Sequence, residues 1–349
     1  MTGWRPRTVT EEPYNAETPP AALVPRLTPV DAFFVRDHFG VPTIDPATWR
    51  LTVDGAVDRP YRLSHRELLA LADREGAREV EVVLECAGNG RALMEPRPPG
   101  VPWGEHAVGC ARFAGVPLAA VLGPAGVRAE AVELVFTGAD SGEVDGRDTP
   151  FERALPVAAA LHPDTLLATR MNGEPLTRRH GAPVRLVVPG RYGVAGVKWL
   201  VGVRAVVEPF NGPFQGGSYV YRESRGTPEG PVAELRVRAL LTEPAPGAPL
   251  RAGEENVLRG RAWSGGGAAV VRVEVRIDRG EWRAADLEAP GGPYGWTPWS
   301  LRWTPGTTGV HTVTVRATDA EGRTQPLTAP WNAGGYGCNP AARRELEVH

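Results

Sequence analysis

One cysteine lies where a metal ligand or a nucleophile would be expected. Residues 79–85 read Glu-Val-Glu-Val-Val-Leu-Glu, a largely alternating pattern that predicts a strand. The strand leads directly into Cys86-Ala87-Gly88-Asn89-Gly90-Arg91, where two glycines permit a tight turn and the close approach of a ligand. A thiolate suits a soft or high-valent metal better than a carboxylate does, and a neighbouring arginine favours the thiolate. On these local features, a buried and unreactive cysteine before a loop is an equally strong interpretation.

The cysteine loop and four other stretches together resemble the sulfite oxidase family. Cys-Ala-Gly-Asn-x-Arg after a strand is similar to the molybdenum-ligating loop of that family. The other stretches, in the family's order, are Phe33-Phe34-Val35-Arg36-Asp37-His38, Gly100-Val101-Pro102-Trp103, Met171-Asn172-Gly173-Glu174-Pro175-Leu176, and His180-Gly181-Ala182-Pro183-Val184-Arg185-Leu186-Val187-Val188-Pro189-Gly190 running on to Val197-Lys198-Trp199. Five ordered stretches over about two thirds of the chain are far more specific than one short motif. A weaker match continues to Asn339.

The resemblance implies a molybdenum–molybdopterin cofactor, with Cys86 as the metal's ligand from the protein. A buried cofactor phosphate needs cationic and amide partners, because an unpaired buried charge is costly. The cofactor-binding residues implied by the match are Phe34, Val35, Arg36, Asp37, His38, Cys86, Asp140, His180, Arg185, Gly196, Val197 and Lys198. From local sequence alone, His180 is better interpreted as a loop histidine with its hydrogen bonds satisfied, and Lys198 as a surface lysine.

Three residues are predicted to serve the substrate. Arg36 and Arg91 can attract and orient an oxyanion, and Trp103 resembles the aromatic wall of the family's pocket. The implied reaction is oxygen-atom transfer at molybdenum, in which sulfite or a related small sulfur or oxo compound is oxidised. The sequence has no Cys-x-x-Cys-His haem-attachment motif, so electrons are expected to pass to a separate acceptor, for example a cytochrome.

Two other functions stay open on the sequence. One is an S- or N-oxide reductase with the same cofactor, which differs only in the direction of oxygen transfer. The other is a non-enzymatic adhesion or scaffold protein in which Cys86 is structural. Metal analysis would separate the second of these from the enzymes, and a screen of sulfite oxidation against S-oxide reduction would separate the enzymes from each other.

The sequence departs from the family's sulfite pocket at three aligned positions. Thr169 stands where a tyrosine is usual, and Ala195 and Gly334 stand where the sulfite-oxidising members have arginines. Each charge-assisted hydrogen bond is worth about 1.5–3 kcal/mol, so the loss of one weakens binding by about tenfold or more. These departures predict sulfite turnover with a high Michaelis constant and a preference for a larger or less charged substrate.

The expected fold is α+β and β-rich, in two domains. A sulfite-oxidase-type molybdopterin domain is expected over residues 1–228, beginning with an extended surface arm over residues 1–30. An immunoglobulin-like β-sandwich is expected over residues 229–349, because short strands alternate there with turn signals. Its predicted strands span 232–240, 256–263, 270–278, 299–303, 311–319 and 345–348. By resemblance this domain makes a homodimer, and its surface is expected to include Trp296, Trp299 and Trp303.

Composition sets limits on other functions. A length of 349 residues suggests two domains, and a net charge of −2 gives no general attraction to nucleic acid or anionic membranes. Three scattered cysteines provide neither a disulfide framework nor a Cys-x-x-Cys zinc site. No apolar run approaches the roughly 20 residues needed for a membrane span. The first residues show no apolar signal region and no twin arginine, so the chain as it stands is expected to be cytoplasmic, with export left open.

Overall fold

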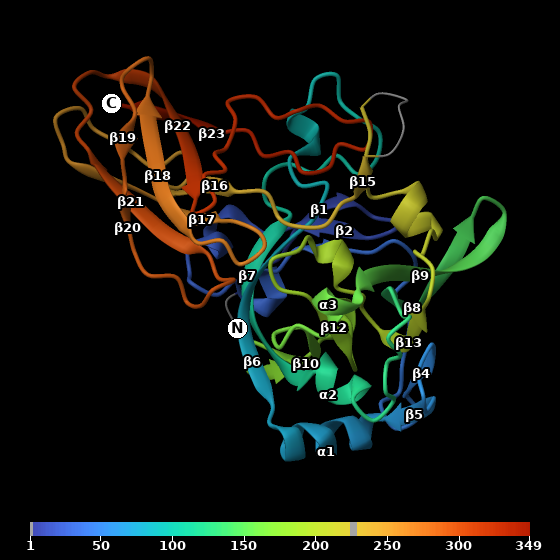
Figure 1. Cartoon of the computed structure of the whole chain (residues 1–349). Helices are drawn as coiled ribbons and strands as arrows, with labels where there is room; N and C mark the ends of the chain where they lie inside the picture. The colour runs from blue at the N-terminus through green and yellow to red at the C-terminus, as the bar shows by residue number, and fades with distance from the viewer. Residues whose placement is uncertain (1–2, 224–228) are drawn as a thin grey trace.

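The computed structural model describes residues 3–223 and 229–349, and strands dominate it. Figure 1 shows an N-terminal region of several small sheets beside a C-terminal β-sandwich, drawn in orange and red. The β-rich α+β fold expected from the sequence is therefore confirmed. The predicted boundary at residue 228 lies outside the described residues.

Three sheets build most of the N-terminal region. The first has the order β1-β2-β3, the second β11-β10-β7-β6 with β12 paired to β10, and the third β5-β4-β13-β8-β9. In the third sheet β4 and β13 run parallel, so the last strand of this sheet in the sequence lies beside the first. The strands are β1 (Arg7–Thr10), β2 (Asn15–Glu17), β3 (Val35–Arg36), β4 (Arg50–Gly55), β5 (Tyr61–Ser64), β6 (Arg78–Glu85), β7 (Val108–Pro117), β8 (Glu133–Val144), β9 (Arg147–Pro156), β10 (Leu166–Met171), β11 (Glu174–Pro175), β12 (Arg185–Val187) and β13 (Leu200–Val206).

The α-helices are few and short. The longest, α1 (His65–Glu75), begins with a capping box: the Ser64 hydroxyl accepts from the Glu67 amide, and the Glu67 carboxylate accepts from the Ser64 amide. The others are α2 (Leu118–Leu122) and α3 (Val157–Ala160). Among the described residues, none of the helices combines the length and the apolar character needed to cross a membrane.

The N-terminal arm is not a surface segment, which corrects the expectation for residues 1–30. β2 is the middle strand of its sheet and pairs with β3, and its three residues are fully buried. Ala22 and Leu23 are also buried in the core. The arm lacks the periodicity of a regular element, so its burial depends on pairing with a strand that follows about twenty residues later.

A polar stretch near Asp140 is part of a strand. Residues 137–141 lie within β8, which continues to Val144 and pairs with β9. The register shifts between Thr137 and Ser141, as in a β-bulge, so the strand can carry polar residues and still keep its partner. Asp140 lies in this irregular part of the strand.

The C-terminal region is the predicted sandwich. Two four-stranded antiparallel sheets have the orders β16-β17-β21-β20 and β19-β18-β22-β23, and apolar side chains from both fill the space between them. Its strands are β16 (Arg238–Glu243), β17 (Asn256–Trp263), β18 (Val270–Ile277), β19 (Arg283–Ala284), β20 (Asp286–Leu287), β21 (Thr297–Trp303), β22 (Gly309–Asp319) and β23 (Ala342–Val348). A further two-stranded sheet, β14 (Val220–Tyr221) and β15 (Gly230–Pro231), precedes it.

Two details of the sandwich differ from the expectation. The first strand begins at Arg238 rather than at Val232, because Val232 and Leu235 pack into the core of the N-terminal region. The three tryptophans expected on a self-association surface are buried: Trp296, Trp299 and Trp303 are 1%, 1% and 6% exposed. In β21 the side chains alternate and Trp299 and Trp303 occupy inward positions, whereas Trp296 precedes the strand and packs in the core of the N-terminal region.

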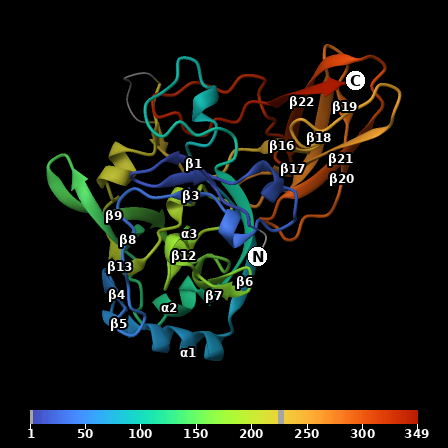
Figure 2. The same cartoon turned by 180° about the vertical axis from the view of Figure 1, so that it is seen from behind.

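The two regions are joined by an extensive contact. In Figures 1 and 2 the red loop that precedes β23 runs from the sandwich back over the N-terminal region. In this loop the Gly337 amide donates to the Ala87 carbonyl at 2.8 Å, directly beside Cys86. From the sandwich side, Arg238 and Trp263 both reach the Glu85 carboxylate, at 3.1 and 2.9 Å. The C-terminal region therefore contacts the cysteine loop on both flanks.

Candidate active site

The cysteine loop has a fixed shape set by its own hydrogen bonds. The Cys86 amide donates to the Ala107 carbonyl at 2.8 Å, and the Asn89 amide donates to the Cys86 carbonyl at 2.9 Å. The Asn89 side chain donates to Glu85 at 2.9 Å and accepts from the Ala107 amide at 3.0 Å. Gly90 has a φ of 86°, which explains the need for glycine there. The thiol of Cys86 is thus presented at the end of β6, as the sequence predicts.

Two hollows meet at this cysteine, and four side chains line both of them: Arg36, His38, Cys86 and Tyr219. The space free of protein atoms is about 740 Å³ in the first hollow and about 760 Å³ in the second, and both volumes include space open to solvent. The first hollow is further lined by Phe33, Phe34, Val35, Leu84, Ala87, Asp140, Phe151, Arg179, His180, Arg185, Gly193, Val194, Gly196, Lys198 and Trp199. The second is further lined by Gly88, Arg91, Pro99, Gly100, Val101, Trp103, Ser218, Gly334 and Tyr336.

Arg185 is a buried cation with hydrogen-bonding capacity to spare. Its side chain donates to the carbonyls of His180 and Gly196, each at 3.3 Å, and only 6% of the residue is exposed. Within the described residues no carboxylate pairs with it, and burial lowers its pKa to about 10, so it remains charged at neutral pH. An anionic ligand in the first hollow would stabilise a buried cation of this kind.

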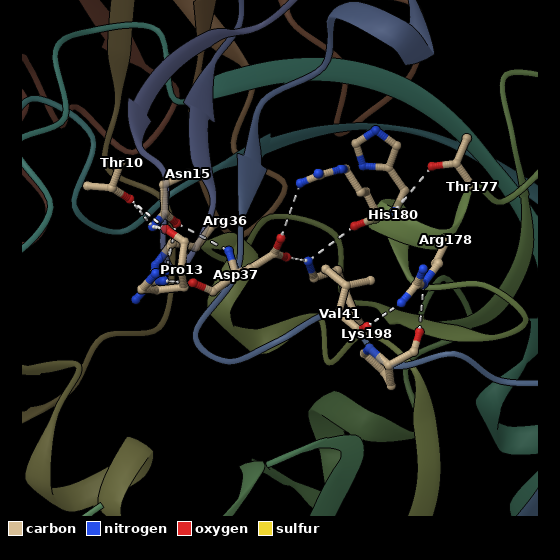
Figure 3. A network of polar contacts seen from close by, with 12 residues as sticks. Thr10, Pro13, Asn15, Arg36, Asp37, Val41, Thr177, Arg178, His180 and Lys198 are labelled. Carbon is tan, nitrogen blue, oxygen red and sulfur yellow. Dashed lines mark hydrogen bonds and ion pairs between the residues drawn. The ribbon is translucent and has the colours of Figure 1, made fainter. Parts of the chain in front are cut away.

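Lys198 is half-buried and lines the first hollow rather than lying free on the surface, which corrects the interpretation from local sequence. Its ammonium group contacts the Asp37 carboxylate and donates to the Arg179 carbonyl at 3.1 Å (Figure 3). Asp37 is 1% exposed and does not line the first hollow, so its carboxylate acts by holding Lys198. Burial lowers the pKa of Lys198, and Asp37 opposes that shift.

His180 has a ring hydrogen bond to the backbone, as the interpretation as a loop histidine expects, and it also lines the first hollow. Its Nε2 lies 3.1 Å from the Val30 carbonyl, and burial lowers the pKa of His180 to about 3, so the ring is neutral. A neutral ring that donates from Nε2 leaves Nδ1 as an acceptor. Burial raises the pKa of Asp140 to about 6, and the positive charge of Lys198 opposes this rise. Both residues line the first hollow.

The remaining predicted cofactor residues fall into two groups. Phe34, Val35, Arg36, His38 and Gly196 line the first hollow. Val197 does not: it is fully buried and packs in the hydrophobic core. Ala195 is likewise a core residue. The structure therefore brings together most of the predicted cradle.

Arg91 and Trp103 line the second hollow, as expected for substrate residues. Arg91 is 5% exposed, and its side chain donates to the Gly334 carbonyl from Nε at 3.1 Å and from Nη2 at 2.9 Å, and to the Val101 carbonyl from Nη1 at 2.9 Å. Its charge is thus held in place by carbonyl groups. Trp103 is 1% exposed and forms part of the wall.

Arg36 is positioned by the N-terminal arm. The Asn15 side-chain oxygen accepts from Arg36 Nη1 and from the Asp37 amide, both at 3.2 Å, while its amide group donates to Thr10 at 2.7 Å and to the Pro13 carbonyl at 2.8 Å. Figure 3 shows this network. Asn15 is fully buried, and its side chain holds two consecutive residues: Arg36, which lines both hollows, and Asp37, which contacts Lys198. No local pattern in the sequence indicates this role of Asn15.

Sequence reasoning also missed a phenol in the pocket. Tyr219 lines both hollows; its hydroxyl bonds His38 and lies 3.5 Å from Arg36 Nη2. Burial raises the pKa of Tyr219 to about 12, although Arg36 opposes the rise, so the hydroxyl keeps its proton at neutral pH. Thr169 lies on β10, is half-buried and lines neither hollow, so the phenol that lines both hollows comes from Tyr219 and not from position 169. The available signal was the aromatic residues of the glycine-rich segment 210–221.

The fold and the two hollows define a molybdopterin-binding oxidoreductase. Residues 38–214 match the family "Oxidoreductase molybdopterin binding domain", and residues 229–348 match "Mo-co oxidoreductase dimerisation domain". The chain belongs to the sulfite oxidase family. It is 38% identical to chicken (Gallus gallus) sulfite oxidase over 356 residues and 37% identical to rat (Rattus norvegicus) mitochondrial sulfite oxidase over 360 residues.

These matches cover 94% and 97% of this chain, but 75% of the chicken protein and 65% of the rat protein. Among solved structures, the sulfane dehydrogenase SoxCD from Paracoccus pantotrophus is similar, with a TM-score of 0.84 and 26% identity over 96% of this chain and 84% of that one. The protein is therefore a molybdopterin-dependent enzyme of the sulfite oxidase type.

The first hollow fits that cofactor. Arg185 supplies a cation without a carboxylate partner among the described residues, Lys198 supplies a second cation, and Cys86 lies where the two hollows meet. Across residues 3–223 and 229–349, no group of three or more His, Cys, Asp or Glu side chains is arranged to hold a metal ion. The fit therefore depends on one thiol beside a cationic cradle.

Proposed function

We propose that this enzyme oxidises sulfite or a related small sulfur compound and that the second hollow is its substrate pocket. The observation that carries the proposal is the convergence of Arg36, Arg91 and Tyr219 beside the Cys86 thiol. We assign Cys86 as the protein ligand to molybdenum, and the first hollow as the cofactor site. A reductase would use the same groups, but no feature of the pocket favours it.

The pocket residues suit a small oxyanion. Arg36 and Arg91 attract and orient it, because guanidinium groups match the geometry of oxyanions. The protonated hydroxyl of Tyr219 can donate a hydrogen bond to the bound anion. Trp103 closes one wall and limits the access of water. When bound, the molybdenum cofactor supplies the oxygen-atom transfer and the two-electron change.

Steady-state kinetics of the holoenzyme with a redox dye as electron acceptor should show sulfite oxidation. Since Gly334 provides no cation, we expect a Michaelis constant about tenfold higher than a pocket with one more charge-assisted bond would give. A Michaelis constant in the micromolar range would contradict this expectation. Reduction of dimethyl sulfoxide by the same enzyme with a reduced dye, in the absence of sulfite oxidation, would favour the reductase instead.

The electron acceptor is proposed to be a separate redox protein, for example a cytochrome. The support for this proposal is that the 349 residues of the chain contain no Cys-x-x-Cys-His motif for covalent haem. The acceptor would approach the molybdenum site from outside the chain.

A homodimer is the assembly that we propose. The support is the match of residues 229–348 to a dimerisation domain, together with the exposed strand edges of the sandwich. The buried tryptophans cannot form the interface, so it must use other residues of this domain. Sedimentation velocity at micromolar concentration should show twice the mass of the chain, 37.4 kDa, and a strict monomer would contradict the proposal.

A further inference from the structure

We propose that Tyr336, a residue of the C-terminal region, positions two groups of the substrate pocket and sets its preference among anions. The inference rests on the proposed function, because it takes the second hollow as the substrate pocket. Tyr336 lies in the loop between β22 and β23, and its side chain lines the second hollow together with Gly334. The region that matches a dimerisation domain would then also complete the active site.

Tyr336 contacts both walls of the pocket. Its ring stacks on Tyr219, with the centroids 5.0 Å apart and the planes at 23°, and its hydroxyl accepts from the Tyr219 amide at 3.3 Å. On the other side, the Arg91 guanidinium lies 5.2 Å from the centre of the same ring. A cation over an aromatic face is attracted by the ring's quadrupole, more strongly where water is excluded. One ring therefore orients both the phenol and a cation of the pocket.

The backbone holds Tyr336 in this place. Its amide donates to the Asn332 side-chain oxygen at 3.0 Å, and the Asn332 amide group donates to the Tyr336 carbonyl at 2.8 Å. Asn332 is 5% exposed, so this reciprocal pair is shielded from water. The neighbouring Gly334 carbonyl accepts two hydrogen bonds from Arg91. The loop is thus built around Arg91.

Glycine at 334 and the ring at 336 depend on each other. A Cβ atom at Gly334 would lie 2.3 Å from Cε2 and 2.6 Å from Cδ2 of Tyr336, far inside contact distance. The arginine that the resemblance leads one to expect at 334 therefore cannot coexist with the ring in its present place. A neutral ring occupies the space next to position 334. The pocket therefore has two cations and an aromatic wall, and it lacks a third cation, which would increase its affinity for dianions.

The first test measures binding of sulfate, a stable dianion, to the holoenzyme by isothermal titration calorimetry. Replacing Tyr336 by leucine should raise the dissociation constant at least about fivefold, because Arg91 and Tyr219 lose their shared support. Tyr336→Phe keeps the ring and should stay within about twofold of the wild type. The matched control is Tyr221→Leu, since the Tyr221 ring also carries an arginine, Arg236 at 4.7 Å, but lines neither hollow.

The second test examines the coupling between positions 334 and 336. Gly334→Arg combined with Tyr336→Ala should bind sulfate about tenfold more tightly than Tyr336→Ala alone, whereas Gly334→Arg in the presence of the ring should gain much less. Equal gains in both backgrounds, or unchanged sulfate affinity in Tyr336→Leu with wild-type molybdenum content, would overturn the proposal. This second comparison holds even if the leucine variant fails to fold.

Failure of the proposed function would look different. If the wild type binds sulfate but does not oxidise sulfite, the substrate assignment is wrong while the role of Tyr336 in the anion site stands. If the wild type oxidises sulfite and the Tyr336→Leu variant shows an unchanged Michaelis constant, the assignment stands and Tyr336 is not a positioning residue. In the expected outcome, the Michaelis constant for sulfite and the sulfate dissociation constant rise together, in Tyr336→Leu but not in Tyr221→Leu.

Discussion

Replacing Cys86 by serine is expected to reduce turnover at least about a hundredfold while leaving the fold intact. Loss of a group that only supports a metal ligand costs up to about a hundredfold, so loss of the ligand itself should cost at least as much. Serine has almost the same shape, and the loop is held by backbone bonds and by Asn89, which the change does not touch. A hydroxyl is a much weaker acid than a thiol, so it does not supply the soft anionic donor that molybdenum would find in a thiolate. X-ray absorption at the molybdenum edge should count one sulfur neighbour fewer in the variant.

The matched control for Cys86→Ser is Cys110→Ala. Cys110 lies on β7, is fully buried and lines neither hollow, so activity per folded molecule should not change. Burial, with the nearby Glu81 carboxylate adding to it, raises the pKa of Cys110 well above the usual range of a thiol, which makes it inert. Full activity of Cys86→Ser, or an unchanged number of sulfur neighbours, would contradict the assignment of Cys86 as the ligand.

Replacing Arg238 by methionine is expected to lower the free energy of unfolding by about 3–5 kcal/mol. Arg238 is 1% exposed and donates to the carboxylate of Glu85, itself 2% exposed, and to the Cys338 carbonyl at 2.7 Å. Methionine keeps much of the apolar packing but leaves Glu85 as a buried charge that only Trp263 and Asn89 still contact. Chemical denaturation followed by circular dichroism measures the change.

The control for this variant is an ion pair of the same type on the surface. Arg302 lies 3.3 Å from Glu255, with 77% and 56% of the two side chains exposed, so Arg302→Met should cost no more than about 1 kcal/mol. Adding Glu85→Gln to Arg238→Met should recover part of the loss, because the uncompensated charge is then removed. Similar costs for the buried and the exposed pair would mean that the two regions are not held together by this contact.

The Arg238 contact gives the sandwich a part in shaping the active site. Glu85 immediately precedes Cys86, and both Arg238 and Trp263 reach it from the C-terminal region. Tyr336 and the Gly334 carbonyl approach the other side of the same loop, through Arg91. The cysteine loop is therefore enclosed by the two regions of the chain, and its geometry depends on how they pack.

The sequence by itself determined the local features of the protein. Alternation over residues 79–85 and a following glycine turn identified the strand and the loop that present Cys86, because burial on one face of a strand has a period of two. The same reasoning located β17 and the sandwich core, and the side-chain chemistry of Ser64 and Glu67 identified the start of α1. Each of these features is encoded within about ten residues of chain.

The tertiary structure alone decided which distant residues surround that loop. Asn15 and Tyr336 carry no local signal of their roles, because each acts through partners far away along the chain, as Arg238 does with Glu85 across 153 positions. A motif alignment does not reveal that Tyr219 supplies a phenol to the hollow although position 169 is a threonine. Nor could it show that the ring of Tyr336 fills the space beside Gly334. Such contacts depend on how separate elements pack, and packing is a property of the whole chain rather than of any segment.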